Sequence, residues 1–440
     1  MKIDTRALFV IDRLNSAGHE AYVVGGCVRD QLLGDEPKDW DVATSAHPTE
    51  VLKIFADNHV IETGLKHGTV TVISDGLPVE VTTFRIESGY EDNRHPSNVE
   101  FVRSLHEDLA RRDFTINAIA YHPGKGLIDP FNGASDLDAR LLRSVGNPGD
   151  RFREDGLRIL RALRFASVLS LKIEDVLSSS IHSNRELLNN ISPERISAEM
   201  TKLLCGDNVL NILTAYPDVL SVFIPEISAM VGFDQKNPYH LYDVWTHTAL
   251  TVAAAPKDAV LRLAMLFHDT GKPSCFTQDE NNIGHFYEHE DKSSEIAKVR
   301  LRELKFDNDT VNAVCELIRW HDIQLTEKNL IKWLNRLGEF RLRQLFAVKA
   351  ADAKSHTPDN EAKKLSALQD REVQLNDILE QGKAFSLKDL AIDGNDLLAA
   401  GILEGPEIGF ILQELLDAVM DDRIDNERQT LLQSAKMLCH

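Results

Sequence analysis

The 440-residue sequence has few cysteines and no long hydrophobic run. Its five cysteines are scattered without paired spacing, which argues against a disulfide framework or a structural zinc site and favours a reducing compartment. No apolar run reaches the roughly 18 residues that span a bilayer, and the N-terminal stretch lacks the continuous apolar core of a signal peptide. We therefore predict a cytoplasmic protein with no membrane partner.

Positive charge is also scarce, since 49 lysines and arginines face 69 acidic residues and give a formal net charge of -20. This balance disfavours non-specific binding to nucleic acid, which requires cations along the phosphates. The exception is residues 140–164, where seven arginines face three acids. This island is either a solvated helix face with ion pairs or a surface that binds anions.

The hydrophobic pattern predicts an α+β fold whose strands lie in the N-terminal third. Short apolar or β-branched runs indicate a small sheet, with a turn at Asp75-Gly76; they are "AYVVGG", "DWDVAT", "GTVTVISDG" and "LPVEVTTFR". The polar segment between Arg85 and Arg111 reads as a mobile loop. Beyond about residue 140 the pattern is helical. Breaks in the pattern predict four regions: 1–140, 141–235, 236–360 and 361–440.

Asp39 and Asp41 lie one residue apart in a predicted strand, so both carboxylates point the same way, roughly 7 Å apart. Carboxylates this close repel each other unless a cation lies between them, and Mg²⁺ prefers carboxylate oxygens together with phosphates. Two Mg²⁺ ions can activate an attacking hydroxyl and stabilise a leaving pyrophosphate. Upstream, Gly25-Gly26 lets backbone amides approach a triphosphate, and Arg29 is placed to clamp it. The spacing therefore favours phosphoryl transfer over a merely solvated strand edge.

The stretch "GGCVRDQLLGDEPKDWDVAT" resembles the nucleotidyltransferase signature of the DNA polymerase β superfamily, in the form found in class II tRNA nucleotidyltransferases (CCA-adding enzymes) and bacterial poly(A) polymerases. Four further blocks are similar to the motifs of that family, in the same order: "LARRDFTINAIAY", "DPFNGASDLDARLLRSVG", "REDGLRILRALRFA" and "ISPERISAEMTKLL". The resemblance implies a polymerase-β-like head over residues 1–140, a neck over 141–235 that recognises the nucleotide base, and a helical body and tail.

The resemblance also implies roles for individual side chains. Asp39 and Asp41 would hold two Mg²⁺ ions, with Glu80 as a third carboxylate; a structural pairing of Glu80 with Arg85 is the alternative. Asp155 and Arg158 would offer hydrogen-bonding groups that suit C and A better than G or U, so that CTP and ATP are chosen without a nucleic-acid template. The residues expected to bind the nucleotide are Gly25, Gly26, Arg29, Arg112, Asp113, Asn117, Asp155, Arg158, Arg161 and Arg164.

Several activities share these motifs: addition of CCA to the 3′ end of tRNA, CC-only or A-only addition, and poly(A) tailing. In this family a flexible loop after Arg85 resembles the element needed for the terminal A, which argues against CC-only addition. The stretch "ETGLKHGTVTV" resembles the CCA-adding enzymes, and the basic tail of poly(A) polymerases is missing. We therefore predict CCA addition with tRNA, CTP and ATP as partners. A-only addition stays open, and so does the choice between monomer and homodimer.

A second set of histidines and aspartates lies in predicted helices of residues 236–360. Their order, H…HD…H…D, resembles the HD phosphohydrolase superfamily, and such a domain is fused to the head in some bacterial CCA-adding enzymes. Imidazoles with carboxylates suit a divalent transition metal. The implied ligands are His247, His268, Asp269, His289 and Asp352, with His289 and His321 as candidates for a second metal. The region is either a metal-dependent phosphohydrolase that acts on RNA ends or an HD-like body that only binds RNA.

The C-terminal stretch "IDGNDLLAAGILEGPEIGFILQELLDAV" resembles the tail of the same family. Gly401, Gly405-Pro406 and Gly409 break its helical pattern and predict a tight helix–turn–helix. In relatives this part reaches the body of the tRNA, but a plain helical hairpin fits the pattern equally well. A purely non-catalytic RNA chaperone is disfavoured, because it leaves the aspartate pair unexplained.

Overall fold

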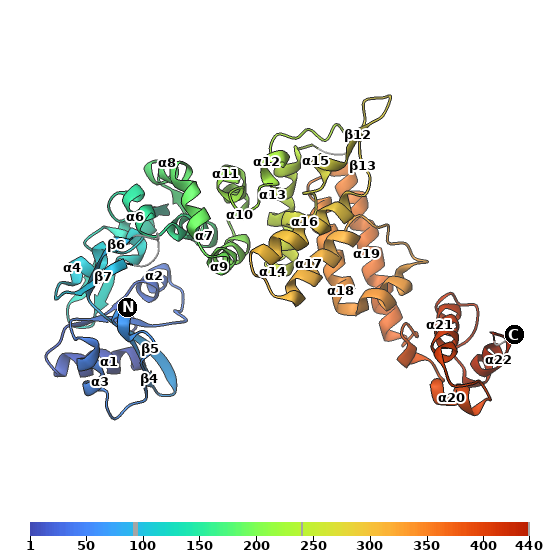
Figure 1. The fold of residues 1–440 in the computed structure, drawn as a ribbon, viewed down its shortest axis with the longest axis horizontal. Coiled ribbons are helices and arrows are strands. Elements are labelled where there is room, and N and C mark those ends of the chain that lie inside the picture. Colours follow the sequence, from blue (N-terminus) through green and yellow to red (C-terminus); the bar gives the residue numbers. More distant parts are fainter. Residues whose placement is uncertain (91–95, 239–240, 439–440) are drawn as a thin grey trace. The chain divides into compact units, whose positions relative to one another are not determined.

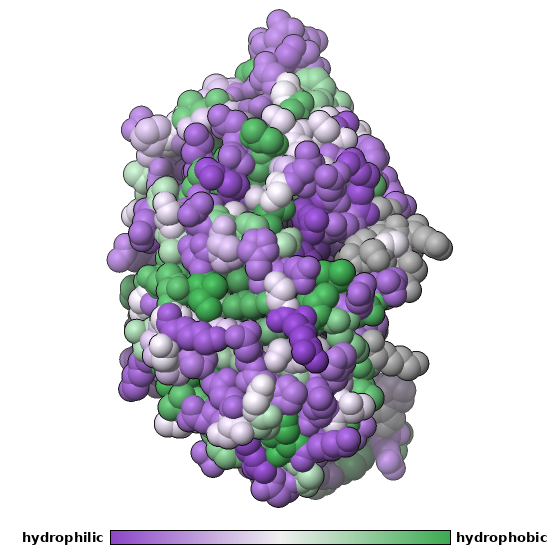
Figure 2. Space-filling model, turned by 90° about the vertical axis from the view of Figure 1, so that its left-hand side faces the viewer, coloured by the Kyte–Doolittle hydropathy of each residue, from purple (hydrophilic) through white to green (hydrophobic). Residues whose placement is uncertain are grey.

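The computed structural model describes residues 1–90, 96–238 and 241–438. The chain forms two compact units, one of Met1–Ala229 with Arg300–Phe306 and one of Met230–Val299 with Asp307–His440 (Figure 1). Among the described residues, no helix is both long and apolar enough to cross a membrane. Hydrophilic side chains cover most of the face shown in Figure 2, with hydrophobic ones in smaller groups between them.

The first unit contains a seven-stranded mixed sheet with strand order β3-β4-β5-β2-β1-β8-β9. Strands β2 and β5 are parallel, and β1 is antiparallel to both β2 and β8. The strands of this sheet are β1 (Ala21–Val24), β2 (Asp41–Thr44), β3 (Val60–Ile61), β4 (Thr69–Ser74), β5 (Leu77–Thr83), β8 (Ala120–His122) and β9 (Gly126–Ile128). The predicted turn between β4 and β5 is confirmed, since Asp75 and Gly76 both have positive φ, of 48° and 77°.

Helix α1 (Thr5–Ser16) packs against this sheet. Its buried residues recur at helical spacing: Ala7, Val10, Ile11 and Leu14. The other helices around the sheet are α2 (Gly26–Leu33), α3 (Pro48–Ile54), α4 (Leu105–Ala110) and α5 (Gly133–Asp138), with the 3-10 turns η1 (Leu65–His67) and η2 (Thr115–Asn117). The head is therefore mixed α and β, as the sequence predicts.

The segment after Arg85 differs from its prediction as a loop. It forms an antiparallel hairpin of β6 (Arg85–Tyr90) and β7 (Pro96–Phe101), followed by α4; residues 91–95 of the predicted loop lie outside the described residues. The Ser104 side chain caps α4 by accepting a hydrogen bond from the backbone N–H of Glu107. The polar composition did not indicate strands here, because neither face of a two-stranded ribbon has to be buried and no alternating apolar pattern is needed.

The rest of the first unit is helical, and α7 (Leu157–Val168) is its central helix. Its apolar positions are buried, among them Leu160, Leu163 and Phe165, and it packs against α9 (Pro193–Leu204). The other elements are α6 (Pro148–Glu154), α8 (Asp175–Asn184), η3 (Arg185–Asn190), α10 (Val209–Ala215), α11 (Pro217–Leu220), α12 (Ile227–Met230), which spans the chain boundary between the two units, and the two-residue strands β10 (Leu141–Leu142) and β11 (Lys172–Ile173).

The second unit is almost entirely helical. Its helices before the tail are α13 (Val244–Ala254), α14 (Ala259–Phe267), α15 (Lys272–Cys275), α16 (His289–Glu303), α17 (Asn308–Trp320), α18 (Leu330–Ala353) and α19 (Pro358–Glu380). A small hairpin of β12 (Phe276–Gln278) and β13 (Gly284–Phe286) corrects the prediction that strands end near residue 140. Gly338, with φ 72°, kinks α18.

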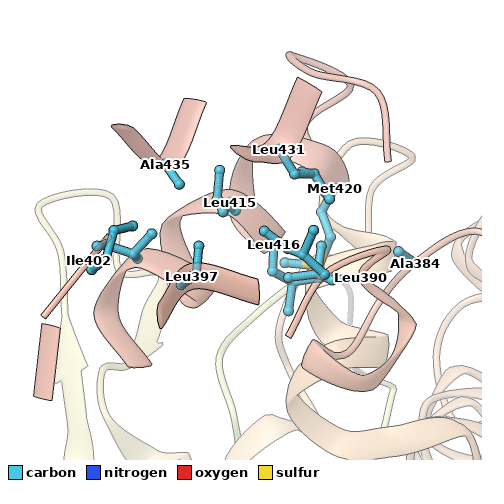
Figure 3. Packing of buried hydrophobic residues seen from close by; sticks show 11 residues of the cluster. Ala384, Leu390, Leu397, Ile402, Leu415, Leu416, Met420, Leu431 and Ala435 are labelled. Carbon is cyan, nitrogen blue, oxygen red and sulfur yellow. The ribbon is translucent and has the colours of Figure 1, made fainter. Parts of the chain in front are cut away.

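The tail has its own hydrophobic core. Figure 3 shows Leu397, Leu415, Leu416 and Leu431 packing together, and all four are fully or almost fully buried. Its elements are η4 (Leu387–Asp389), α20 (Gly394–Ala399), α21 (Pro406–Met420) and α22 (Arg428–Leu438). Gly401 and Gly405 lie between helices as predicted, whereas Gly409 lies inside α21 and breaks nothing.

Candidate active site

Three carboxylates meet at one end of the central strands of the head. Asp41 begins β2 and is the register partner of Glu80 on the parallel strand β5, and Asp39 precedes Asp41 by two residues. Burial, together with the carboxylates of Glu80 and Asp39, raises the pKa of Asp41 to about 6. A carboxylate in this position gains from a nearby cation, and oxygen ligands of this kind suit Mg²⁺.

The glycine pair forms the entry to α2. Gly25 has φ 75°, and a Cβ at this position would lie 2.7 Å from the Arg112 guanidinium, so glycine is required. Gly26 is the first residue of α2, whose amino-terminal end lines the same cavity as Asp39 and Asp41. Free backbone N–H groups and the helix dipole make this end attractive to an anion such as a phosphate.

A chain of hydrogen bonds links α2 to α7. The Arg29 guanidinium donates to the Asn117 side-chain oxygen at 2.7 Å, and the Asn117 amide donates to Asp113 at 3.0 Å. Asp113 also accepts two bonds from Arg161, at 2.8 and 2.6 Å. Burial alone would raise the pKa of Asp113, but the Arg161 guanidinium outweighs it and holds that pKa below its usual value. These groups are therefore fixed before any nucleotide arrives.

The cavity between these elements encloses about 670 Å³ and brings together nearly all of the predicted head residues. It is lined by every residue expected to bind the nucleotide and by the aspartate pair: Gly25, Gly26, Arg29, Asp39, Asp41, Arg112, Asp113, Asn117, Asp155, Arg158, Arg161 and Arg164. Glu80 lies beside Asp41 on the neighbouring strand but is not among the residues that line the cavity. The lining residues that sequence reasoning missed are Arg111, Leu157, Phe165 and Arg195.

Asp155 and Arg158 are each held by a partner that was not predicted. The Asp155 carboxylate accepts two hydrogen bonds from Arg195 of α9, at 3.2 and 2.7 Å. Arg158 donates a hydrogen bond to the carboxylate of Glu154 at 2.6 Å. Glu154 is four residues earlier and is the last residue of α6. Asp155 itself has extended backbone angles and lies outside α7, so the two residues form no ordinary helix-surface pair. Arg195 is part of the quoted block "ISPERISAEMTKLL", which was the available signal.

Phe165 lies at the centre of a group of arginines. The guanidinium carbons of Arg29, Arg161 and Arg164 lie 5.1, 5.4 and 3.7 Å from the centre of its ring. Arg164 also pairs with Glu199 at 2.6 Å. The face of an aromatic ring attracts cations. The ring therefore holds like charges from two helices close together on the wall of the cavity.

The second unit gathers the predicted histidines and aspartates into two adjacent triads. One is His247, His268 and Asp352, and the other is Asp269, His289 and His321; within each triad the possible ligand atoms lie within 4.8 Å of one another. Asp269 joins the two, since its oxygens lie 3.2 Å from His247 Nε2 and 3.5 Å from His289 Nε2. The cavity beside the triads encloses about 600 Å³.

Hydrogen bonds fix the tautomers of the four histidines. His268, His289 and His321 each use Nδ1 to donate to the backbone carbonyl three residues earlier. His247 Nδ1 faces the Ser355 hydroxyl, which donates its own proton to the Asp352 carbonyl and so accepts from the imidazole. All four Nε2 atoms consequently lie on the side of the carboxylates, where each could serve as a metal ligand.

The Nε2 atoms also lie close to one another. His247 Nε2 and His268 Nε2 are 3.2 Å apart, and His289 Nε2 and His321 Nε2 are 3.4 Å apart. Burial, with His268 and His289 nearby, holds the pKa of His321 well below its usual value. Lys272 supplies one positive charge, 2.7 Å from Asp269. Imidazole and carboxylate ligand atoms grouped this closely fit one or two divalent transition-metal ions.

Comparisons with known proteins agree with this arrangement of the chain. The family model described as "Poly A polymerase head domain" matches residues 21–143. The model described as "Probable RNA and SrmB-binding site of polymerase A" matches 170–230, and the one described as "tRNA nucleotidyltransferase domain 2 putative" matches 277–435. The CCA-adding enzyme of Limosilactobacillus reuteri is 35% identical over 97% of this chain and 95% of its own.

Two solved structures are similar to this chain. The CCA-adding enzyme of Bacillus stearothermophilus in complex with CTP has a TM-score of 0.76 and 30% identity, over 99% of this chain and 97% of its own. The Thermotoga maritima CCA-adding enzyme complexed with tRNA shares the fold at 19% identity, with a TM-score of 0.60 over 100% of this chain and 97% of its own. The chain therefore belongs to the family of CCA-adding enzymes, the nucleotidyltransferases that complete the 3′ end of tRNA without a nucleic-acid template.

Proposed function

We propose that this chain adds C, C and A to the 3′ end of tRNA from CTP and ATP, with Mg²⁺ held by Asp39, Asp41 and Glu80. The observation that supports this most is the pairing of Asp41 with Glu80 on parallel strands, directly beside the arginine-lined cavity. Bound Mg²⁺ would supply charge for activating the tRNA 3′-hydroxyl and for the leaving pyrophosphate. Because its substrates are tRNA, CTP and ATP, we expect the protein in the cytoplasm.

The cationic groups of the chain hold the triphosphate for in-line attack. Arg29, Arg112 and the amino-terminal end of α2 lie on one wall of the cavity and suit the β- and γ-phosphates. The tRNA 3′-oxygen then forms a bond to the α-phosphorus, the bond from that phosphorus to the bridging oxygen breaks, and pyrophosphate leaves. The hydroxyl proton passes to solvent or a nearby carboxylate.

Base selection falls to Asp155 and Arg158. The carboxylate offers acceptors and the guanidinium offers donors, a combination that matches the edges of C and A. Arg195 and Glu154 hold the two side chains in place, so that selection depends on four residues rather than two. A small reorientation of this group would let the same pocket accept first C and then A.

The test is the length of the product on a synthetic tRNA that lacks all three nucleotides. With Mg²⁺, CTP and ATP together, we expect a product three nucleotides longer, and with CTP alone a product two nucleotides longer. Asp39→Ala should abolish both while the circular dichroism spectrum stays unchanged. Long tails with ATP alone would identify a poly(A) polymerase, and addition only to tRNA that already ends in CC would identify A-only activity.

A second activity, metal-dependent hydrolysis of phosphate esters, is favoured by the paired triads of the second unit. Four imidazoles and two carboxylates come together there beside a cavity. A bound metal would supply an activated water. In hydrolysis the water oxygen bonds to phosphorus, the ester P–O bond breaks, and the departing oxygen takes up a proton.

The metal content of the purified protein tests this second activity independently of turnover. We expect one to two equivalents of a divalent transition metal by mass spectrometry, and loss of most of it in His268→Ala. A metal-free protein that gains neither metal nor phosphate release after incubation with Mn²⁺, Ni²⁺ or Co²⁺ would leave the region as a body that only binds RNA.

A further inference from the structure

A buried carboxylate lies behind the arginine-lined wall of the nucleotide cavity. It belongs to Asp108 of α4, whose side chain is fully buried and is not among the residues that line the cavity. Arg111 and Arg112 follow it at i+3 and i+4, and both of them do line the cavity. Residues at this spacing lie on the same side of a helical turn. Asp108 therefore pairs with two cavity arginines without reaching the cavity itself.

The two carboxylate oxygens of Asp108 have different partners. Oδ1 accepts hydrogen bonds from Nε and Nη2 of Arg111, at 3.1 and 2.9 Å, and a longer one of 3.4 Å from the backbone N–H of Arg85. Oδ2 accepts a hydrogen bond from Nη2 of Arg112 at 3.3 Å. Three N–H groups on one oxygen restrict how the carboxylate can turn. Arg111 and the Arg85 backbone thus hold the carboxylate, and Oδ2 holds Arg112.

The Asp108 carboxyl is ionised at neutral pH in spite of its burial. Burial alone would raise its pKa, but the charges of Arg111 and Arg112 outweigh that effect and hold the pKa below its usual value. A buried charge of this kind is stabilised only while its partners stay in place. The carboxylate therefore ties both guanidinium groups to one position.

Arg112 is held on two sides and keeps donor capacity for a ligand. Its Nη2 donates to Asp108, and its Nη1 donates to the backbone carbonyl of Asn117 at 3.3 Å. Nη1 also abuts Gly25, where a Cβ would lie only 2.7 Å away. The Arg112 Nε is buried and has no hydrogen-bond partner within the described part of the chain. Asp108 and Asn117 therefore orient a guanidinium that still has N–H groups for a phosphate.

We propose that Asp108 is a positioning residue for nucleotide addition: it acts through Arg112 and sets the orientation in which that guanidinium meets the triphosphate of CTP or ATP. This role of Asp108 rests on the proposed function, in which Arg112 binds the triphosphate. The alternative is an ion pair with Arg111 that only stabilises the fold. Loss of the Asp108 charge weakens phosphate binding in the first case, and changes only the free energy of unfolding in the second.

The experiment measures how tightly the full-length protein binds phosphates that carry no base. Inorganic tripolyphosphate can compete with CTP for the triphosphate site, and its inhibition constant Ki, at a fixed concentration of free Mg²⁺, reports on Arg112 but not on base selection. The variants are Asp108→Asn, which removes the charge at nearly constant size, Arg112→Met, and the double variant. Glu226→Gln is the matched control, because it removes a carboxylate charge opposite Arg300 in the same unit, outside the cavity.

Asp108→Asn should raise Ki for tripolyphosphate and KM for CTP about tenfold each, with a smaller loss of kcat, because a charge-assisted bond to Arg112 is lost. The preference for CTP over UTP should stay unchanged, because Arg158 keeps its bond to Glu154. In the Arg112→Met background, Asp108→Asn should change Ki by less than about twofold, because the residue through which it acts is gone. Glu226→Gln should leave Ki at the wild-type value.

Two failures can be told apart. If wild-type protein extends tRNA, but Asp108→Asn lowers the melting temperature without raising Ki, or raises Ki equally in the Arg112→Met background, Asp108 does not act through Arg112 and the proposed function stands. If wild-type protein adds no nucleotide to tRNA, the proposed function itself is wrong and the positioning role falls with it. Asp108→Glu keeps the charge but displaces the carboxylate, and it takes the place of Asp108→Asn if that variant does not fold; an unchanged Ki in Asp108→Glu would equally contradict the proposal.

Discussion

Among single residues, Asp41 shows most clearly that the head is built for a cation. Its carboxyl has a pKa of about 6 against an ordinary value of 3.8, because of burial and the neighbouring acids. The metal-free folded protein therefore binds a proton between these pH values that the unfolded chain does not, and loses stability as the pH rises through this range. Above pH 6 the raised pKa of Asp41 lowers the free energy of unfolding by up to roughly 3 kcal/mol.

Asp41→Asn should consequently raise the melting temperature of the metal-free protein at pH 7.5 while it abolishes nucleotide addition. Differential scanning calorimetry in EDTA measures the first effect and product length the second. Asp35→Asn, at an exposed position outside the site, is the control and should change neither. If Asp41→Asn lowers the melting temperature, the carboxyl has a structural role that the metal interpretation omits.

Arg195 is the residue through which base selection is most easily disturbed. Its guanidinium binds both oxygens of Asp155, and a paired, partly buried bond of this kind holds the carboxylate in one orientation. Arg195→Met should lower the ratio of kcat/KM for CTP over UTP by about tenfold, with a smaller loss of total rate. Arg153→Met, at a surface ion pair on α6, should leave the ratio unchanged.

The sequence predicts the residues of the site better than it predicts their hydrogen-bond partners. Asp39, Asp41 and the residues from Gly25 to Arg164 could be placed because motif spacing fixes which side chains share a strand or a helix. Arg195 could not, since its salt bridge from α9 to Asp155 at the end of α6 depends on how the helices pack. The pair of Glu154 with Arg158, four residues apart, is local by contrast. The tautomers of the four histidines were likewise beyond sequence, because each depends on a local carbonyl or hydroxyl.

Elements show the same division between local and non-local information. The turn at Asp75-Gly76 and the helix α7 follow from residue chemistry and periodicity, and both were predicted. The parallel pairing of β2 with β5 joins strands almost forty residues apart, and no local pattern specifies it. That pairing places Glu80 beside Asp41.

Phe165 is an element-scale contact, since it connects arginines of α2 with those of α7. Phe165→Leu keeps an apolar side chain but removes the ring face under Arg29, Arg161 and Arg164. Each cation–ring contact contributes about 0.5–2 kcal/mol, so we expect KM for CTP and ATP to rise roughly tenfold, with kcat reduced less.

Phe114→Leu provides the comparison for Phe165→Leu. The Phe114 ring is buried and meets the Phe165 ring edge-on, 5.8 Å away. Loss of the Phe114 ring should lower the melting temperature about as much as loss of the Phe165 ring does, but without the rise in KM. Phe165→Tyr should restore nucleotide affinity. If both leucine variants change KM equally, Phe165 acts only through packing.

On the scale of the whole molecule, the nucleotide cavity lies in the first unit and the paired triads lie in the second. Each has its own ligand set, of carboxylates in one case and of imidazoles with carboxylates in the other. Oxygen ligands favour Mg²⁺ and imidazoles favour transition metals. The two centres should therefore respond to different metals as well as to different mutations.

Asp39→Ala and His268→Ala separate the two centres in one chain. Asp39→Ala should lose nucleotide addition and keep both bound transition metal and phosphate release. His268→Ala should do the reverse, because His268 belongs to the first triad and is fully buried in the second unit. Assays of both variants for tRNA product length, metal content and phosphate release give six independent readings. Loss of both activities in His268→Ala, with an unchanged melting temperature, would mean that the triads support tRNA binding rather than a separate reaction.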